Sequence, residues 1–470
     1  MSSDAVSVGA AEQARLMRDG RLSCEALMEA MLDRTAAVNG ALNAVVSMRD
    51  AQELLAEARE ADRSEPAGPL HGVPIAIKDL ADAKGLPTSQ GSPAFAGRIA
   101  AADSPHVAAL RQAGAIVIGK TNTPEFGLGS HTYNPVHGVT ANPYDLSRSC
   151  GGSSGGAAVA LAAGMLSIAD GSDMMGSLRN PAGWNNVYGM RPSWGRVPGG
   201  ADGDVFLHRL STNGPMARCP VDLALLLDVM SPPRTGGLPG PAFAPVGALD
   251  GDAAGLRVAW LADWDAALPM EDGILSVCEA ALDVFGRIGC AVDRPGAPFS
   301  RDALWYAWTA LRSWSIAADL SEMYEDDALR GHLKPEAIWE VERGRALSAL
   351  DVHAASCVRS DWLRAADAFF GNFDVLALPT AQVWPFDKTL DWPKSIAGTS
   401  MDTYHRWMEV VIPASLLGLP AVAVPAGFGA QGLPMGLQLI GRHGDDAMLL
   451  NLAEAYHRET RWPGARPPVP

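Results

Sequence analysis

One stretch of the sequence, residues 149–177, limits what the chain can fold into; it reads SCGGSSGGAAVALAAGMLSIADGSDMMGS. Residues 157–165 are apolar on every face of a helix, so they predict a helix buried in the interior of a large protein. The following segment, LSIADGS, predicts a strand that leads into a turn. The glycine and serine residues of this stretch therefore lie at the ends of buried elements, inside a packed core.

Several interpretations of the Gly-Ser run are open. A flexible linker is disfavoured because the run lies between a loop and an apolar helix. A phosphate-binding loop is disfavoured because the run lacks both the Gly-Lys-Ser/Thr ending and the preceding strand of a dinucleotide motif. A nucleophile elbow centred on Ser154 needs a buried strand directly before it, whereas TANPYDLSRSC is polar. Its histidine base would have to come from a distant residue such as His405 or His443.

A serine activated by a lysine is the remaining interpretation. Lys78 ends a short predicted strand, VPIAIK. A lysine can act as a base only when it is neutral, and its reference pKa of about 10.4 must then be lowered by burial. The alternative is an exposed lysine at a strand end. The residues alone leave both alternatives open.

Charge and apolar pattern exclude several classes of partner. The formal net charge of −16, with no long basic run, argues against nucleic-acid binding, which requires Lys and Arg at the phosphates. The longest apolar run covers residues 157–169, shorter than the about 20 residues of a membrane span. The six cysteines are far apart and the N-terminus lacks a signal-peptide pattern. We therefore expect a cytoplasmic protein with reduced thiols, without a nucleic-acid or membrane partner.

Several long blocks of the sequence resemble the successive blocks of the amidase signature family. They cover most of the chain except about residues 230–370, and they read GPLHGVPIAIKDL, AGAIVIGKTNTPEFGLG, NPYDLSRSCGGSSGGAAVALAAG, GSDMMGSLRNPAGWNNVYGMRPSWGRVP, DVLALPT and GLPAVAVPAGFGAQGLPMGLQLIG. Their order and length make the resemblance far more specific than a lone G-x-S-x-G.

The resemblance implies an α/β fold with a large mixed, mainly parallel twisted sheet covered by helices on both sides. We expect a single domain over 1–470, with a catalytic core at about 65–225 and 370–470. A Pro/Gly-rich linker (231–247) precedes a variable helical substrate lobe at about 240–370. The tryptophans of this lobe (Trp305, Trp308 and Trp314) either line a substrate channel or fill the core of the lobe, and the second alternative is favoured.

The family's Ser–cis-Ser–Lys triad maps onto three residues of this chain. The resemblance implies Ser177 as nucleophile, Ser153 on a cis peptide bond as proton relay, and Lys78 as base. It implies an oxyanion hole formed by the N–H groups of Met174, Met175, Gly176 and Ser177. It also implies substrate contacts at Gly127, Gly129, Ser130 and Asn180.

Neighbouring residues of the triad receive other roles. Ser154 is expected to be structural, and Asp173 is expected to pair with Arg179 and brace the nucleophile loop. Met174-Met175 departs from the family pattern, which commonly has Thr or Ile followed by Gly. We expect one of these methionines in the core and the other in the wall of the acyl pocket.

The implied function is hydrolysis of C–N bonds in small-molecule amides, including aryl amides or carbamates, without a metal or cofactor, by a monomer or homodimer. The alternative is an ammonia-releasing subunit of a tRNA-dependent amidotransferase complex, since such subunits share these motifs. A catalytically silent binding protein on the same fold is a further alternative, although Lys78, Ser153 and Ser177 are all present.

Overall fold

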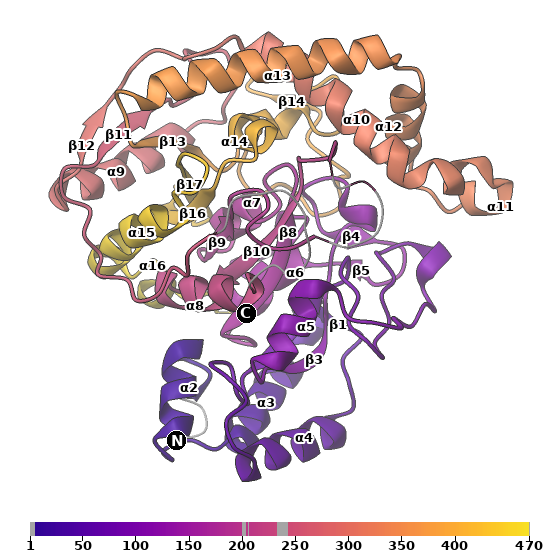
Figure 1. Cartoon of the computed structure of the whole chain (residues 1–470), viewed down its shortest axis with the longest axis vertical. Coiled ribbons are helices and arrows are strands. Elements are labelled where there is room, and N and C mark those ends of the chain that lie inside the picture. Colours follow the sequence, from indigo (N-terminus) through magenta and orange to yellow (C-terminus); the bar gives the residue numbers. More distant parts are fainter. Residues whose placement is uncertain (1–4, 200–203, 205, 233–242, 470) are drawn as a thin grey trace.

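The computed structural model describes residues 5–199, 204, 206–232 and 243–469. Its centre is an eight-stranded mixed sheet with the strand order β12-β11-β13-β17-β16-β9-β10-β8 (Figure 1). The strands are β8 (Ile168–Asp173), β9 (Tyr188–Arg191), β10 (Thr212–Ala217), β11 (Arg257–Trp260), β12 (Ala291–Asp293), β13 (Val375–Pro379), β16 (Ala421–Phe428) and β17 (Pro434–Ile440). The predicted α/β fold with a large mixed sheet is confirmed.

A smaller sheet continues the structure beyond β8. Its strand order is β1-β3-β2, with β1 at Val45–Val46, β2 at Pro74–Lys78 and β3 at Ile116–Thr121. The N–H of Lys78 donates to Asp170 Oδ1 of β8 at 2.8 Å, so the end of β2 lies beside β8. Three short hairpins complete the strands: β4 (Tyr133–Asn134) with β5 (Gly138–Val139), β6 (Ala141–Asn142) with β7 (Asp145–Ser149), and β14 (Ser395–Ile396) with β15 (Thr399–Ser400).

The prediction that the large sheet is mainly parallel was wrong. Within the described residues, β11 pairs in parallel with β12 and β13, whereas every other pairing in this sheet is antiparallel. A tight connection joins β16 to β17, and such connections allow only antiparallel pairing. Helices cover both faces of these strands, so even antiparallel strands read as continuous apolar runs, a pattern that is typical of parallel sheets.

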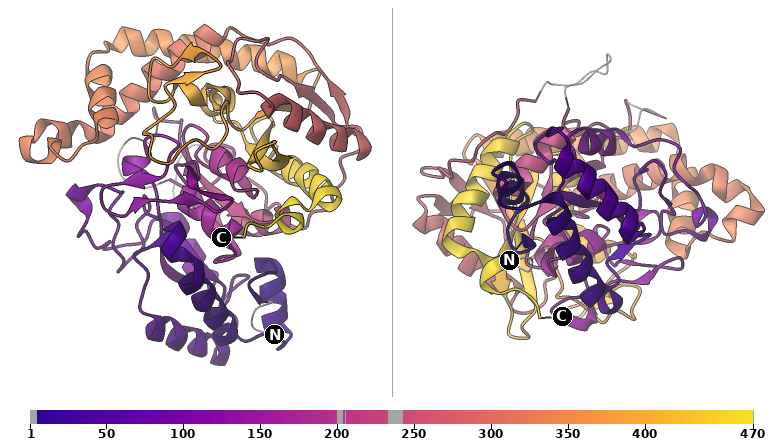
Figure 2. Two further views of the ribbon diagram at one scale, coloured as in Figure 1. Left: turned by 180° about the vertical axis from the view of Figure 1, so that it is seen from behind. Right: turned by 90° about the horizontal axis from the view of Figure 1, so that it is seen from below.

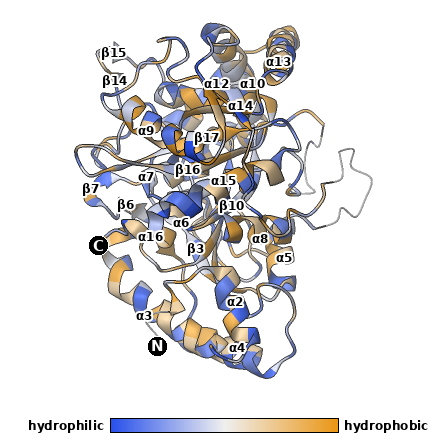
Figure 3. Ribbon diagram, turned by 90° about the vertical axis from the view of Figure 1, so that its left-hand side faces the viewer, coloured by the Kyte–Doolittle hydropathy of each residue, from blue (hydrophilic) through white to orange (hydrophobic). Residues whose placement is uncertain are grey.

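Helices flank the strands along the whole chain. They are α2 (Ala10–Arg18), α3 (Cys24–Leu42), α4 (Ala51–Arg63), α5 (Pro105–Gln112), α6 (Gly155–Ala162), α7 (Arg179–Trp184), α8 (Pro220–Met230), α9 (Ile274–Arg287), α10 (Arg301–Glu325), α11 (Asp327–Arg330), α12 (Pro335–Arg345), α13 (Ala349–Phe370), α14 (Ile412–Leu417), α15 (Asp446–Thr460) and α16 (Trp462–Ala465). Figure 3 shows both hydrophobic and hydrophilic segments on α4, as expected for a surface helix. Among the helices of the described ranges, none is both long and apolar enough to cross a membrane.

Alternating side chains divide the interior into two layers, one on each face of the sheet. Ala169 of β8 and Ala423 of β16 pack in one cluster with the apolar residues of α6. Their neighbours Ile168 and Val422 pack in the other cluster, with residues of α8, α9 and α15. Because successive side chains of a strand point to opposite faces, the sheet is covered on both sides.

The helical lobe is formed by α10 to α13, which arch over one end of the sheet, opposite the N-terminal helices (Figure 2). The predicted lobe of 240–370 began too early, because β11 and β12 within it are strands of the main sheet. Of the predicted linker, residues 233–242 lie outside the described residues. Trp308 is fully buried in the core, which agrees with the favoured alternative for this residue.

Candidate active site

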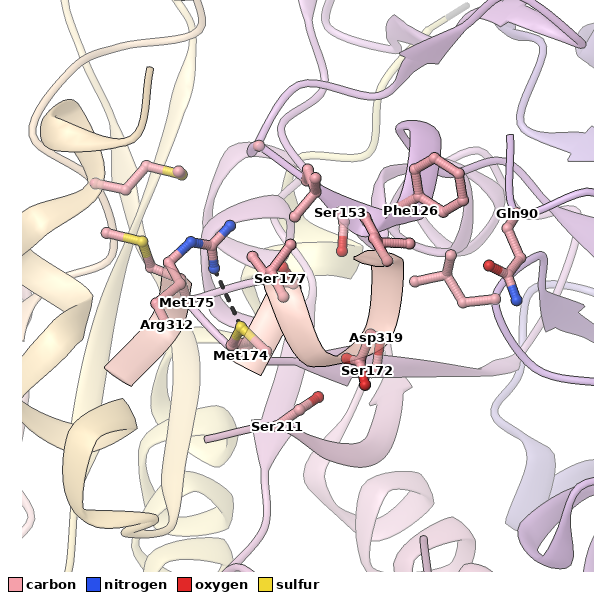
Figure 4. Close-up of a pocket in the computed structure, with 17 residues that line it drawn as sticks. Gln90, Phe126, Ser153, Ser172, Met174, Met175, Ser177, Ser211, Arg312 and Asp319 are labelled. Carbon is pink, nitrogen blue, oxygen red and sulfur yellow. Dashed lines mark hydrogen bonds between the residues drawn. The ribbon is translucent and has the colours of Figure 1, made fainter. Parts of the chain in front are cut away.

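A cavity of ≈ 180 Å³ lies between the sheet and α10 (Figure 4). Its lining residues come from four parts of the chain: Leu80 and Gln90; Phe126, Gly127, Leu128 and Gly129; Ser153, Ser172, Met174, Met175, Ser177 and Ser211; and Arg312, Ile316, Asp319, Leu320 and Met408. Polar and apolar groups contribute almost equally to this surface, which suits a ligand that carries both kinds of group. Within the described residues, no group of three or more His, Cys, Asp or Glu side chains is arranged to hold a metal ion.

Lys78 stands at the end of β2 and is 1 % exposed. Its Nζ lies 2.7 Å from Ser153 Oγ, 2.9 Å from Ser154 Oγ and 3.0 Å from Ser172 Oγ. The peptide bond between Gly152 and Ser153 is cis, as expected from the resemblance. The structure therefore brings together Lys78 and Ser153, which are 75 residues apart in the sequence. Ser172 is a neighbour of the lysine that the sequence analysis missed.

Burial controls the charge of Lys78. Removal from water disfavours the ammonium form and lowers the pKa of Lys78 to about 7, although Asp170 and Asp173 act in the opposite direction. At neutral pH, a substantial fraction of this side chain is therefore neutral. A neutral amine at 2.7 Å can take the proton of the Ser153 hydroxyl.

Ser177 lies in the turn between β8 and α7 and is 8 % exposed. It lines the cavity together with Ser153, and both serines are labelled in Figure 4. The backbone links them as well, because the N–H of Ser154 donates to the carbonyl of Ser177 at 3.1 Å. A substrate in this cavity would therefore lie against both Ser177 and Ser153, and Ser153 Oγ is 2.7 Å from Nζ of Lys78.

Asp173 organises the turn that carries Ser177. Its carboxylate accepts the N–H of Gly176 at 2.9 Å, the N–H of Leu178 at 3.1 Å and Nε of Arg179 at 3.0 Å. Burial acts to raise the pKa of Asp173, but Arg179 and Arg191 outweigh it and hold this pKa well below its usual range. The predicted ion pair between Asp173 and Arg179 is confirmed.

One of the predicted oxyanion donors needs a correction. The N–H of Gly176 is held by Asp173, so it is not directed at a ligand in the cavity. Gly176 also adopts a left-handed conformation (φ 78°), which only glycine enters readily. Of the predicted set, the N–H groups of Met174, Met175 and Ser177 remain candidate donors.

The predicted substrate contacts divide into two pairs. Gly127 and Gly129 line the cavity. Ser130 and Asn180 do not: Ser130 Oγ lies 2.5 Å from the Gly152 carbonyl and 2.7 Å from Asn180 Oδ1. Both side chains are buried, and Ser130 satisfies the Gly152 carbonyl next to the cis peptide bond. Neither residue belongs to the lining of this cavity, so the structure does not support them as substrate contacts there.

Because Gly127 has no side chain, its backbone can lie close to Leu80 and Ser153. A Cβ atom at this position would lie 2.8 Å from Leu80 Cδ1 and 3.4 Å from Ser153 Oγ. The residue also has a left-handed φ of +69°. A larger side chain would therefore disturb both the backbone and the surroundings of Ser153.

Helix α10 contributes a wall that the sequence analysis missed. Arg312, Ile316, Asp319 and Leu320 line the cavity at the spacing i, i+4, i+7 and i+8, which is one face of a helix. Among the described residues, no tryptophan of α10 lines the cavity. Trp305, for example, packs under the guanidinium of Arg406. The helical spacing of 312–320 was the available signal, but the sequence did not show what this face covers.

Both methionines of the nucleophile turn line the cavity. Met175 is 3 % exposed and is also part of the core, whereas Met174 is half-buried. The Sδ atom of Met174 lies 3.1 Å from Nη1 of Arg312 (Figure 4). The predicted division into one core residue and one wall residue is therefore too sharp, since Met175 serves in both places.

Comparison with known proteins gives consistent matches. The family model described as amidase matches residues 26–450. An acylamidase of Rhodococcus erythropolis is 34% identical over 98% of this chain and 97% of its own length. A glutamyl-tRNA(Gln) amidotransferase subunit of Chloroflexus aggregans is 34% identical over 95% of each chain. The solved structure of a bacterial aryl acylamidase of the amidase signature family superposes with a TM-score of 0.88, at 27% identity over 98% of this chain and 99% of that one.

Proposed function

Because the chain belongs to the amidase family, with amide-hydrolysing relatives, we propose that it hydrolyses aryl amides and aryl carbamates through an acyl-enzyme on Ser177. The observation that carries the proposal is the buried Lys78, hydrogen-bonded to Ser153 beside a cavity that also contains Ser177. The similarity to an aryl acylamidase supports an aryl substrate.

In the proposed acylation step, Ser177 Oγ attacks the carbonyl carbon of the substrate. Its proton passes to Ser153 Oγ, while the Ser153 proton passes to the neutral Nζ of Lys78, which becomes an ammonium group. The negative charge of the tetrahedral intermediate develops on the carbonyl oxygen. The N–H groups of Met174, Met175 and Ser177 receive it; one such donor typically contributes about 2.7–4 kcal/mol to transition-state stabilisation.

Collapse of the intermediate breaks the C–N bond. The proton returns from Lys78 through Ser153 to the leaving nitrogen, so the amine departs in neutral form. Water then attacks the acyl-enzyme, and the same groups remove its proton and return one to Ser177. The products are the amine and a carboxylic acid, or, from a carbamate, the amine and a carbonic half-ester that releases CO2.

The test uses the isolated chain with 4-nitroanilides, aryl carbamates and aryl esters. We expect Ser177-dependent release of 4-nitroaniline, complete loss of it in Ser177→Ala, and labelling of Ser177 by a fluorophosphonate detected by mass spectrometry. Ser154→Ala is the matched control, because it removes the neighbouring serine of the Gly-Ser run and leaves Ser177 in place. Labelling of Ser154 in place of Ser177 would contradict the proposal.

The same experiment tests the amidotransferase alternative, which the similarity to the Chloroflexus aggregans protein keeps open. Turnover of simple amides by the chain alone, at a rate useful for catalysis, would argue against an obligate subunit. If Ser177 is labelled but simple amides are not cleaved, the ammonia-releasing subunit becomes the better interpretation. Absence of labelling on the folded chain would favour a silent binding protein.

A further inference from the structure

Arg312 is a buried cation whose head reaches the substrate cavity. The residue is 3 % exposed, and its Nε donates to Glu340 Oε1 at 2.8 Å. Its Nη2 donates to the hydroxyl of Tyr404 at 2.7 Å, and that hydroxyl donates to Glu340 at 2.8 Å. These bonds fix the plane of the guanidinium, and Glu340 balances its charge. Such a fixed donor is available to a ligand at little conformational cost.

The third nitrogen of this guanidinium, Nη1, faces the cavity. Its neighbour at hydrogen-bond distance is the thioether sulfur of Met174, at 3.1 Å (Figure 4). A thioether is a weak acceptor, whereas a charged donor forms its strong hydrogen bonds with oxygen. Because the Met174 side chain is flexible, an oxygen atom of a ligand can displace it and take the better bond.

The charges around the cavity indicate which kind of oxygen fits. Asp319 lines the same cavity from the same helix, about 10 Å further along its axis. Glu340 already balances the charge of Arg312, and Asp319 adds a further acidic group, although burial raises its pKa. A carboxylate of the substrate would therefore be repelled, whereas a neutral ether, ester or carbamate oxygen would meet no such repulsion.

The backbone of Met174 identifies the part of the substrate that lies nearest to Arg312. In the proposed function, the N–H of Met174 belongs to the turn that binds the carbonyl oxygen. Its side chain extends from that turn to Arg312. The acyl group bound at the turn therefore lies within one side chain's length of the guanidinium.

We propose that Arg312 is a specificity-determining residue, whose Nη1–H donates to a neutral oxygen in the acyl part of the substrate. The substrates selected are amides whose acyl chain carries an ether oxygen close to the scissile carbonyl, and carbamates, whose alkoxy oxygen takes that place. The assignment rests on the proposed function and adds the substrate class to it.

Three isosteric 4-nitroanilide substrates test the assignment: the butanoyl anilide, the methoxyacetyl anilide and the ethyl carbamate. In the second and third, an oxygen replaces one methylene of the butanoyl chain. We measure kcat and KM for each substrate with the wild type and with Arg312→Met. For each protein, the kcat/KM of each oxygen substrate is divided by that of the butanoyl anilide. The intrinsic reactivity of the substrates cancels in this comparison. We expect the relative kcat/KM of at least one oxygen substrate to fall about ten- to hundred-fold, mainly through KM.

Arg312→Met leaves the carboxylate of Glu340 buried without its cation, so folding needs its own control. The double variant Arg312→Met/Glu340→Gln removes that charge, and fluorophosphonate labelling of Ser177 reports an intact site. Unchanged ratios for both oxygen substrates in a folded, labelled variant would overturn the assignment. Lack of Ser177-dependent turnover of the butanoyl anilide by the wild type would instead overturn the proposed function, and the assignment with it.

Discussion

The pH dependence of acylation should follow the protonation of Lys78. Burial lowers the pKa of this lysine to about 7, and only the neutral form accepts a proton from Ser153. With one titrating base, the neutral fraction rises from about one tenth at pH 6 to about nine tenths at pH 8, so kcat/KM for a neutral anilide should increase about tenfold over that range. The activity is gained as the pH rises, because deprotonation creates the base.

Asp170→Asn provides the perturbation. Asp170 acts to raise the pKa of Lys78 and accepts the Lys78 N–H at 2.8 Å, while its other oxygen lies 3.1 Å from Nε2 of His106. Asparagine keeps the shape and an acceptor for the backbone N–H but removes the charge. We expect the apparent pKa to fall by about one unit, which reduces the increase between pH 6 and pH 8 from about tenfold to about twofold.

Single-turnover release of 4-nitroaniline measures acylation alone, since the later hydrolysis of the acyl-enzyme does not contribute. The unfolding midpoint of each protein at each pH shows whether the native state is retained. A flat acylation profile between pH 6 and pH 9 would refute the assignment of Lys78 as the base. Identical midpoints of the pH profile in the wild type and in Asp170→Asn would refute the role given to the charge of Asp170.

Three further predictions follow from the contacts. Ser154→Ala removes one oxygen neighbour of Lys78 Nζ and should lower kcat/KM by about tenfold or less, the effect of one neutral hydrogen bond; complete loss of Ser177 labelling would contradict this and restore the nucleophile elbow. Asp173→Asn leaves Arg179 buried without its carboxylate and should lower the free energy of unfolding in urea by about 3–5 kcal/mol; a loss below about 1 kcal/mol would contradict it. Burial lowers the pKa of His131 to about 4, so the unfolded chain binds this proton near pH 6.5 and the folded chain does not. The free energy of unfolding should therefore fall by roughly 3 kcal/mol as the pH drops from 6.5 to 4. The variant His131→Gln should reduce this pH dependence.

Lys78 could be singled out from the residues because it stands at the end of a local element, whereas Ser153 and Ser177 were assigned through the family resemblance. Lys78 ends an apolar strand, and Ser177 follows the strand that begins after a buried helix. Their approach in space rested on the family resemblance, since β2 and β8 belong to different sheets and are linked by Asp170. Periodicity describes each element separately and carries no information on such a contact.

The differences between the expected and the observed site have a common physical origin, which is the direction in which each polar group points. Gly129 and Ser130 are adjacent in sequence, but Gly129 lines the cavity, whereas Ser130 Oγ donates to the Gly152 carbonyl. The composition of this loop indicated small residues and available space without showing which way each residue faces. In the same way, Gly176 was assigned as a donor by its position in the turn, whereas its N–H donates to Asp173.

The two walls of the cavity come from distant parts of the chain, and this separates chemistry from selectivity. The reacting groups and their supports lie on β2 and on the stretch between Ser153 and Ser177, whereas the facing wall belongs to α10. A substitution on α10 can change which acyl group fits while it leaves the hydrogen bonds of Lys78 in place. The contact between Met174 and Arg312 is where the two walls meet. Variation at these two positions should therefore alter the preference between oxygen-containing and purely aliphatic acyl groups more than the pH profile, which depends on Lys78.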